Sequence, residues 1–433
     1  MATQFSEVEG RRWKAPFFTI WTGQALSLIG SQLVQFALIW YLTSLTGSAK
    51  VLAIAALVGL LPQVIFGPII GSYVDRLNRR VIMIVADTFI AMATVGLAIL
   101  FATNQIEIWH IYTLMFVRSL AGGFHHNAMT ASTSLMVPTE QMTRIQGINQ
   151  TMQGGLNIIS APLGALLLEV LEMQAILAID VGTALFAIIP LLFISIPQPA
   201  RIESGESKHT SVWEDTKAGF SYVMSWPGLL IMLAMATMIN FLLNPASALM
   251  PLLVTKHFGG GALQLGWLEA SFGIGVIMGG ITLGIWGGFK RRVATAMFGV
   301  TGLGLGFLVF GFTPPSGFNL VLGAAIFSGI MIPIANGAIG AILQTTVSPD
   351  MQGRVFTLVG SVAMGMSPIG LIIAGPVADT FGILTWYWLG GAVCTLFGIS
   401  GFFIPTLMNI EEEKKAVLET SSDEKKELLV AAD

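Results

Sequence analysis

The sequence is poor in charge and in cysteine. Charged residues make up 10% of its 433 residues and the mean hydropathy is +0.78, whereas a soluble domain carries roughly 25% charged residues. So few charges cannot cover a water-exposed surface, and we therefore expect a membrane protein. The single cysteine, Cys394, lies in an apolar run, which excludes a disulfide framework within the chain and a zinc site built on cysteine pairs.

The motifs of several enzyme classes are missing too. There is no G-x-x-x-x-G-K-[ST] loop, no H-E-x-x-H and no G-x-S-x-G, which argues against an ATP-driven pump, a metalloprotease and a serine hydrolase. The longest polar interruption, residues 197–227, is too short for a catalytic domain. The net charge of -3 provides no basic surface for nucleic acid. We expect a protein that is not an enzyme and uses no cofactor and no metal.

Long apolar runs dominate what is present. Crossing a bilayer takes about 20 apolar residues, and twelve runs meet this length, at residues 17–43, 50–73, 81–103, 108–134, 145–169, 174–196, 228–254, 262–288, 293–312, 318–344, 355–379 and 383–408. Residues 197–227 have the prolines and mixed polar composition of a linker. The predicted fold class is an all-α membrane protein of twelve transmembrane helices, with six-helix bundles at 17–196 and 228–408 and polar ends at 1–16 and 409–433.

The lysines and arginines predict the orientation of the chain, because they are retained on the cytoplasmic side of short loops. Of the 21 in the sequence, only Lys50, Lys256 and Arg118 lie outside the N-terminus, the even-numbered connections and the C-terminal tail. We therefore expect a multi-pass protein of the plasma membrane with both termini in the cytoplasm.

The two halves of the chain repeat each other in their charged loops. GSYVDRLNRR at residues 71–80 is echoed by GIWGGFKRRV at 284–293, where Gly288 replaces the acid at Asp75. VPTEQMTRI, with Arg144, is echoed by SPDMQGRVF, with Arg354. Two echoes in corresponding places predict parallel repeats related by an axis along the membrane normal, an arrangement found in secondary transporters.

These motifs resemble a known family. GSYVDRLNRR is similar to the loop motif of the major facilitator superfamily, and Leu114, Arg118 and Gly122 resemble its fourth-helix arginine motif. FFTIWTGQALSLIGSQ, FGPIIGSYVDR and VRSLAGGFH resemble the macrolide efflux branch of the family's drug exporters, and the resemblance runs from residue 17 to residue 405. One departure follows FH, where the branch often has Thr-Pro and this chain has His126 and Asn127.

The resemblance implies a transporter that exports a hydrophobic or amphiphilic compound, a macrolide-like drug included, in exchange for protons by alternating access. Its partners are then the cargo, protons and membrane lipids. One chain suffices as a monomer, because the implied cavity lies within it. Two alternatives stay open: an importer or uniporter of a metabolite, and a membrane sensor that binds a ligand without moving it.

The resemblance also implies that the charged loop is a latch holding the cytoplasmic side shut, built from Gly71, Asp75, Arg76, Arg79 and Arg80. Physically, Gly71 would let the second helix end, and Asp75 would accept hydrogen bonds from the first amides of the third helix or from an arginine. Arg79 and Arg80 would pair with acids or lipid phosphates. The alternative is that these residues only keep the loop in the cytoplasm.

Three charges inside the spans are candidates for proton coupling: Arg118, Asp87 and Glu269. A charge near mid-span costs roughly 2.5–3.5 kcal/mol on insertion scales and needs a cavity or a partner. Asp87 lies roughly 10 Å from the cytoplasmic end of its run and Arg118 roughly 15 Å from the outer end of its own. In a hydrocarbon core of about 30 Å these depths are similar, so we expect the two to pair, for coupling or for structure. Glu269 is a proton carrier or a structurally satisfied acid.

The other titratable residues in the spans are given simpler roles. Asp180, in AIDVG, is expected to pack between helices or lie at an interface, and His125 and His126 are expected at the inner mouth of the fourth span. The resemblance implies that the first, fourth, seventh and tenth helices line the cargo cavity. Uncharged polar residues deep in the first, seventh and tenth spans are therefore the expected cavity lining: Gln24, Ser31, Gln35, Asn240, Asn244 and Asn336.

Overall fold

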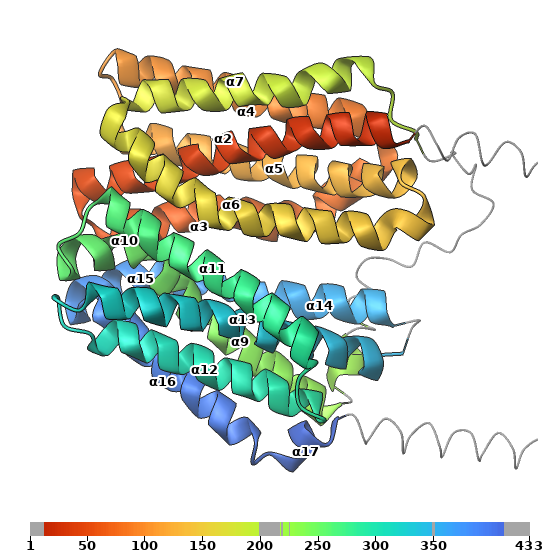
Figure 1. Cartoon of the computed structure of the whole chain (residues 1–433), viewed down its shortest axis with the longest axis vertical. Coiled ribbons are helices and arrows are strands. Elements are labelled where there is room, and N and C mark those ends of the chain that lie inside the picture. The colour runs from red at the N-terminus through yellow and green to blue at the C-terminus, as the bar shows by residue number, and fades with distance from the viewer. Residues whose placement is uncertain (1–12, 199–216, 218–219, 225, 349–350, 411–433) are drawn as a thin grey trace, which may run out of the picture. The chain divides into compact units, whose positions relative to one another are not determined.

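The computed structural model describes residues 13–198, 217, 220–224, 226–348 and 351–410, and this part of the chain contains helices and no strands (Figure 1). The described residues form two compact units. The first contains residues 13–198 together with Ala248–Gly273 and Leu371–Ile383, and the second contains the remainder. Most of the expected linker and most of both expected tails lie outside the described residues, and the proposed boundaries at 17–196 and 228–408 stay a prediction.

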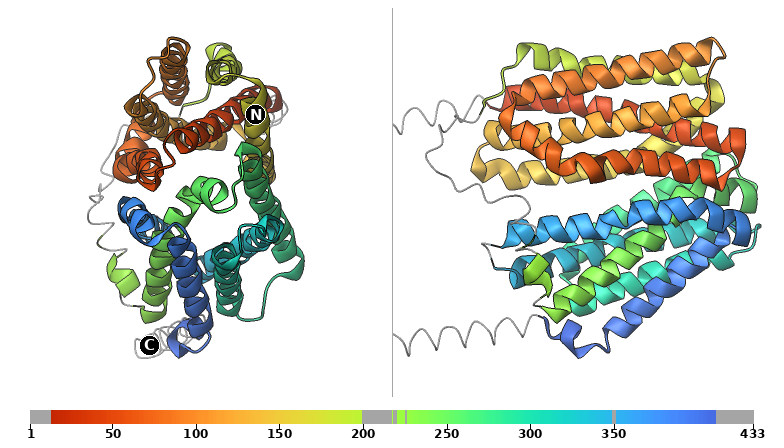
Figure 2. Two further views of the ribbon diagram at one scale, coloured as in Figure 1. Left: turned by 90° about the vertical axis from the view of Figure 1, so that its left-hand side faces the viewer. Right: turned by 180° about the vertical axis from the view of Figure 1, so that it is seen from behind.

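Six long helices form the body of the first unit: α2 (Lys14–Thr46), α3 (Ala49–Arg76), α4 (Arg79–Ala102), α5 (Ile108–Met136), α6 (Met142–Val170) and α7 (Met173–Phe193). A short 3₁₀ turn, η1 (Thr139–Gln141), precedes α6. Figure 2, left, looks along these helices. α4 packs between α5 and α7, α2 packs against α6 and α7, and α3 packs against α5.

Short turns with matching residues join these helices. Gly47 closes α2 with φ of 54°, in the left-handed region that favours glycine, and its N–H donates to the Thr43 carbonyl. Ser48 then caps α3 by accepting a hydrogen bond from the Val51 amide at 3.4 Å. Two residues are therefore enough to connect α2 and α3.

The loop expected after the second span is shorter than the sequence indicated. α3 continues through Gly71 to Arg76, so the prediction that Gly71 ends this helix is wrong. A side chain at Gly71 would meet nothing within 4 Å, and the apolar run of the helix simply extends past it. The cap of α4 is Asn78, whose side chain accepts from the Arg80 and Val81 amides at 3.0 and 3.3 Å. Asn78 fills the capping role expected of Asp75, whose side chain lies outside the described part of the structure.

The second half of the chain supplies α9 (Pro227–Ala248), α10 (Met250–Leu252), the π-helical η2 (Leu253–His257), α11 (Ala262–Trp286), α12 (Arg292–Phe312), α13 (Phe318–Thr346), α14 (Gln352–Gly365), α15 (Ser367–Phe381), α16 (Leu384–Gly401) and α17 (Pro405–Met408). The eleventh expected span is split at Met366 into α14 and α15. All twelve expected spans are thus helical. Among the described residues, ten helical segments are long and apolar enough to cross a membrane.

α12 is the central helix of the second unit and packs against both α13 and α16. Gly304 of α12 and Gly391 of α16 allow the two backbones to approach closely. A Cβ on Gly304 would lie 2.4 Å from the Thr395 amide nitrogen, and one on Gly391 would lie 2.7 Å from the Leu308 amide nitrogen. Small residues that bring helix backbones together are typical of helix packing in lipid.

The outer surface of α4 is apolar. Val81, Val85, Phe89 and Met92 follow one another at helical spacing, and each is between 52% and 58% exposed. In water such a continuous apolar stripe would be unfavourable, whereas lipid tails are as apolar as these side chains. The first unit therefore presents a surface suited to lipid along α4.

Candidate functional site

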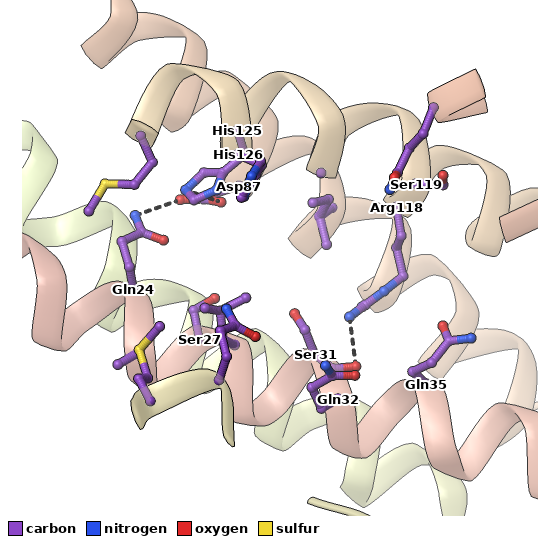
Figure 3. A pocket seen from close by; sticks show the side chains of 18 of the residues that line it. Gln24, Ser27, Ser31, Gln32, Gln35, Asp87, Arg118, Ser119, His125 and His126 are labelled. Carbon is purple, nitrogen blue, oxygen red and sulfur yellow. Dashed lines mark hydrogen bonds and ion pairs between the residues drawn. The ribbon is translucent and has the colours of Figure 1, made fainter. Parts of the chain in front are cut away.

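A cavity of about 840 Å³ lies within the first unit and is lined by residues of α2, α3, α4, α5 and α6. This volume is in the range of sites that hold drug-sized ligands. Three of the expected cavity residues, Gln24, Ser31 and Gln35 of α2, line it (Figure 3). Trp21, also on the wall, donates from its indole nitrogen to the Asn149 side-chain oxygen at 2.7 Å, which links α2 to α6.

The sequence interpretation missed a row of amides on α6. Gln146, Asn149, Gln150 and Gln153 all line the cavity. Their spacing of i, i+3, i+4 and i+7 places them on one face of the helix. This periodicity in an otherwise apolar span was the signal that could have identified them. Gln32 of α2 and Gln63 of α3 also line the cavity and were missed as well.

Arg118 of α5 has a carboxylate partner, and it is Asp180 of α7. Its Nη1 lies 2.5 Å from Asp180 Oδ2, with the two side chains only 10% and 3% exposed. The same nitrogen donates to Thr94 Oγ1 at 3.2 Å, and Nη2 donates to the Ser31 carbonyl at 3.2 Å. The expected Asp87–Arg118 pair is therefore wrong as a contact: the arginine joins α5 to α2, α4 and α7 through other groups.

Two hydroxyl groups also contact the Asp180 carboxylate, one at each oxygen. The Ser31 hydroxyl donates to Oδ1 at 3.2 Å and the Thr94 hydroxyl lies 3.4 Å from Oδ2, and the residue is 2% exposed. The prediction that Asp180 packs between helices holds, but its pairing with Arg118 was missed. A depth estimate would have found it, since Asp180 and Arg118 lie roughly 10 and 15 Å from the starts of helices that begin on the same expected side.

Asp87 of α4 lies in a second cluster with Gln24 and His125. Gln24 Nε2 donates to Asp87 Oδ2 at 3.2 Å, and His125 Nε2 is 3.6 Å from Asp87 Oδ1, which is slightly longer than a hydrogen bond. His125 Nε2 is itself buried and has no hydrogen-bond partner among the described residues. Figure 3 shows Asp87 between Gln24 and the two histidines, apart from Arg118, which points toward the α2 segment of Ser31. Asp87 is 7% exposed and lines the cavity.

Two arginines of the charged loop bind helix ends instead of acids. Arg79 Nη1 donates to the Ala131 carbonyl of α5 at 2.8 Å, and its backbone amide donates to Gln198 Oε1 at 3.2 Å. Arg80 donates from Nε and Nη2 to the carbonyls of Leu191 and Leu192 in the last turn of α7, each at 2.5 Å. The expected pairing of these arginines with acids is not formed within the described residues. Arg76, at the end of α3, is exposed.

No metal site is formed by the part of the chain that the structure describes, where no group of three or more histidine, cysteine, aspartate or glutamate side chains gathers.

The sequence profile of the Major Facilitator Superfamily matches residues 20–252 and 229–431. The chain belongs to this superfamily. Proteins of this family and fold are transporters and not enzymes, and the chain is accordingly a multi-pass membrane transporter.

Curated relatives of this superfamily member include drug exporters. The chain is 36% identical over 387 residues to Macrolide efflux protein A of Streptococcus pyogenes, which covers 89% of this chain and 95% of the relative. It is 34% identical over 325 residues to the protein of the same name from Enterococcus faecalis, covering 75% and 100%. With the Multidrug efflux pump Tap of Mycolicibacterium fortuitum the identity is 25% over 397 residues, covering 89% and 95%.

Solved structures share the fold of this superfamily member. A mutant of the nucleoside transporter NupG aligns with a TM-score of 0.69 at 13% identity, covering 90% of this chain and 98% of that one. A D-xylose-proton symporter aligns with a TM-score of 0.65 at 13% identity and the same coverage. These likenesses support the fold.

The remaining candidate residues of this superfamily member lie in the second half of the chain. Asn244 donates to the Asn240 carbonyl and to Ser367 Oγ, both at 2.9 Å, and so links α9 to α15. Asn336 of α13 is exposed. Glu269 of α11 is partly buried and makes no hydrogen bond or ion pair with the described residues. None of these four residues lines the cavity of the first unit.

Proposed function

We propose that this transporter exports a hydrophobic or amphiphilic compound, macrolide-like drugs included, in exchange for protons and by alternating access. The similarity to macrolide and multidrug efflux proteins supports the cargo class. The observation that carries the proton exchange is Asp87, a buried carboxylate on the wall of a drug-sized cavity with a histidine nitrogen 3.6 Å away. A charge in this position is typical of proton relays in transporters.

Asp87 is the group to which we assign proton binding. As a carboxylate it accepts from Gln24 and lies 3.6 Å from His125 Nε2. A proton on Asp87 removes its charge and weakens both interactions. The side chains of α2 and α5 are then released from α4 at the cavity wall. Proton binding and the shape of the cavity are thus linked through the same contacts.

Arg118 and Glu269 are the other two proposed coupling residues, and they have different roles. Arg118 is held by Asp180, Thr94 and Ser31 and supplies a fixed positive charge to the cavity it lines. Glu269, which has no partner among the described residues, is the second candidate for carrying a proton. The driving force suffices without ATP, because each charge crossing 100 mV is worth about 2.3 kcal/mol.

The latch, the orientation and the location are also part of the proposal. The end of α3 with Gly71, Asp75 and Arg76 and the start of α4 with Arg79 and Arg80 close the cytoplasmic side, both termini lie in the cytoplasm, and the membrane is the plasma membrane. The chain works as a monomer within the lipid bilayer. Its Asn240, Asn244 and Asn336 belong to the cargo path of the second half.

The test is transport in inverted membrane vesicles with an acidic interior. A radiolabelled 14-membered macrolide should accumulate in vesicles that contain the parental protein, and a protonophore should abolish the accumulation. Asp87→Asn should reduce accumulation to the level of empty vesicles while the purified variant still binds the macrolide. Glu169→Gln, which changes an exposed acid of α6 in the same unit, serves as the matched control and should transport normally.

Three outcomes would contradict the proposal. Accumulation that is insensitive to the protonophore indicates a uniporter or another coupling ion. Binding without accumulation indicates a ligand sensor. Parental transport by Asp87→Asn removes Asp87 from the coupling, and Glu269→Gln then has to be tested in its place.

A further inference from the structure

The wall of the cavity is unusually rich in amide side chains. Eight of them line it: Gln24, Gln32, Gln35, Gln63, Gln146, Asn149, Gln150 and Gln153. Four belong to one face of α6, which we call the α6 amide face and define as Gln146, Asn149, Gln150 and Gln153. Along the helix axis this face is roughly 10 Å long.

Most of these amides have unused hydrogen-bonding groups. Gln24 donates to Asp87, and Asn149 accepts from Trp21 through its oxygen. The other six form no hydrogen bond with any residue that the structure describes, and Gln146, Gln150 and Gln153 are exposed on the cavity side of α6. Each free primary amide offers two N–H donors and one carbonyl oxygen with two lone pairs.

None of the ionisable residues that line the cavity belongs to the α6 amide face. The four ionisable lining residues of the cavity are Asp87, Arg118, His125 and His126. Arg118 is paired with Asp180 at 2.5 Å, and Asp87 accepts from Gln24 and lies 3.6 Å from His125 Nε2. All four ionisable residues belong to α4 and α5, so the side chains of the α6 amide face are uncharged and suit hydroxyl, carbonyl and ether oxygens.

Apolar side chains complete the lining. Met129 of α5, Met152 of α6 and Leu28 of α2 lie on the same cavity wall as the amides. A methionine-rich surface adapts to ligands of different shape. A cargo that has one oxygen-rich side and one apolar side would satisfy both parts of the lining.

We propose that the α6 amide face is a subsite for the uncharged, oxygen-rich part of the cargo, such as the sugars and hydroxyl groups of a glycosylated lactone. The inference rests on the proposed function and names the substrate chemistry that this cavity selects. Amide N–H groups donate to carbonyl, ether and hydroxyl oxygens, and amide oxygens accept from hydroxyl groups. Ligand hydroxyl and carbonyl groups supply the hydrogen-bond partners that these amides lack within the described residues.

The experiment measures binding to the purified full-length protein in detergent with three probes: a 14-membered macrolide that carries its two sugars, the sugar-free aglycone of the same lactone, and ethidium. Gln150→Met and Gln153→Met keep side-chain length and remove the amide. Each should raise the Kd of the glycosylated macrolide by about threefold to tenfold, which corresponds to one lost hydrogen bond. The Kd values for aglycone and ethidium should change by less than twofold.

Two further variants control for folding and for position. Gln150→Asn keeps an amide on a shorter side chain, so it should weaken binding less than Gln150→Met. Thr151→Val changes an exposed residue of α6 that does not line the cavity, and it should leave all three Kd values unchanged. Monodisperse elution on size exclusion confirms that each variant is folded.

The outcomes separate this inference from the proposed function. Equal weakening of all three probes, or no change for any of them, would overturn the subsite. If either result is found while the parental protein exports the macrolide in a proton-dependent way, the transport proposal is supported and only the subsite is wrong. If instead the amide variants lose only the glycosylated macrolide while the parental protein fails to accumulate any probe, the subsite stands and the transport proposal is overturned.

Discussion

At the scale of single residues, Arg118 is the most constrained side chain of the site. It contacts groups from α2, α4 and α7 while belonging to α5. Removing one partner of a buried ion pair leaves an uncompensated charge, which typically costs 3–5 kcal/mol, whereas replacing both partners with apolar residues is often neutral. The pair thus fixes how four helices lie against one another.

Asp180→Asn should therefore destabilise the protein strongly, by about 3–5 kcal/mol, because Arg118 loses the carboxylate at 2.5 Å. The measurement is the thermal unfolding midpoint in detergent, followed by intrinsic tryptophan fluorescence. The double variant Arg118→Met/Asp180→Leu should unfold at a higher temperature than Asp180→Asn alone. Asp379→Asn, an exposed acid on α15, is the control. An unchanged midpoint for Asp180→Asn would show that the pair does not stabilise the first unit.

At the scale of helices, the arginines at the start of α4 have a structural role that is separate from any latch. The last carbonyls of a helix lack partners within it, and positive charges are favoured there. Arg80 supplies both, since it donates to the carbonyls of Leu191 and Leu192 near the end of α7. Arg79 donates to the Ala131 carbonyl, five residues before the end of α5, which also accepts from the Ser134 hydroxyl. The start of α4 is thereby fixed to the ends of both neighbours.

Arg80→Gln should lower stability by about 1.5–3 kcal/mol, the range for hydrogen bonds made by charged groups. The same unfolding assay detects it, and transport measured well below the unfolding temperature should remain above half of the parental rate. Arg76→Gln is the matched control for stability, because Arg76 is an exposed arginine at the end of α3. A normal unfolding midpoint combined with lost transport would instead favour the latch as the sole role of Arg80.

The two echoed loops differ as structural elements. α3 continues to Arg76, but α11 ends at Trp286, and Gly287 and Gly288 follow with φ of 73° and 83°. Residues with a side chain are unfavourable in this left-handed region by roughly 1–2 kcal/mol. A Cβ on Gly288 would also lie 2.7 Å from Thr295 Oγ1. This geometry explains why the second repeat has glycine where the first has Asp75.

Gly288→Asp, which restores the acid of the first repeat, should therefore destabilise the protein by about 1–3 kcal/mol. The unfolding midpoint measures the loss. Gly284→Ala is the control: Gly284 lies within α11, where a Cβ meets nothing within 4 Å, so alanine should be neutral or stabilising by about 0.5–1 kcal/mol. Equal midpoints for Gly288→Asp and the parent would contradict the role of the left-handed backbone.

At the scale of the whole molecule, we expect successive helices to cross the membrane in alternating directions, so that successive connections lie on opposite sides. The basic residues predict that the connection between α3 and α4 is cytoplasmic and that the one between α4 and α5 is external. Cys394 is fully buried and unpaired. Because Cys394 is the only cysteine of the sequence, replacing it leaves an introduced cysteine as the sole thiol that a maleimide can label.

In a Cys394→Ala background, Gln105→Cys should react with a membrane-impermeant maleimide on intact cells, because Gln105 is exposed in the connection before α5. Leu77→Cys, at a residue that is 53% exposed, should react only in inverted vesicles. The readout is a gel shift of the purified protein. Labelling of Leu77→Cys on intact cells would reverse the proposed orientation, and with it the direction assigned to proton entry.

The class of protein, the positions of the spans and part of the cavity follow from the sequence. Hydropathy is local, so runs such as 81–103 predicted α4 (Arg79–Ala102) within a few residues. The α2 residues Gln24, Ser31 and Gln35 were found because polar side chains stand out in an apolar helix. The helix boundary at Gly71 was wrong, because a glycine permits a helix to end without requiring it.

Only the tertiary structure decided which side chains meet. Sequence position gives the depth of a residue in the membrane, but contact also depends on the direction in which it points, and that direction rotates by about 100° with each residue of a helix. Asp87 and Arg118 lie at similar depths on adjacent helices, yet the rotation and packing of α4, α5 and α7 direct Arg118 to Asp180 and Asp87 to Gln24 and His125. The same packing turns the amides of α6 toward α2 around one cavity, which no single helix specifies.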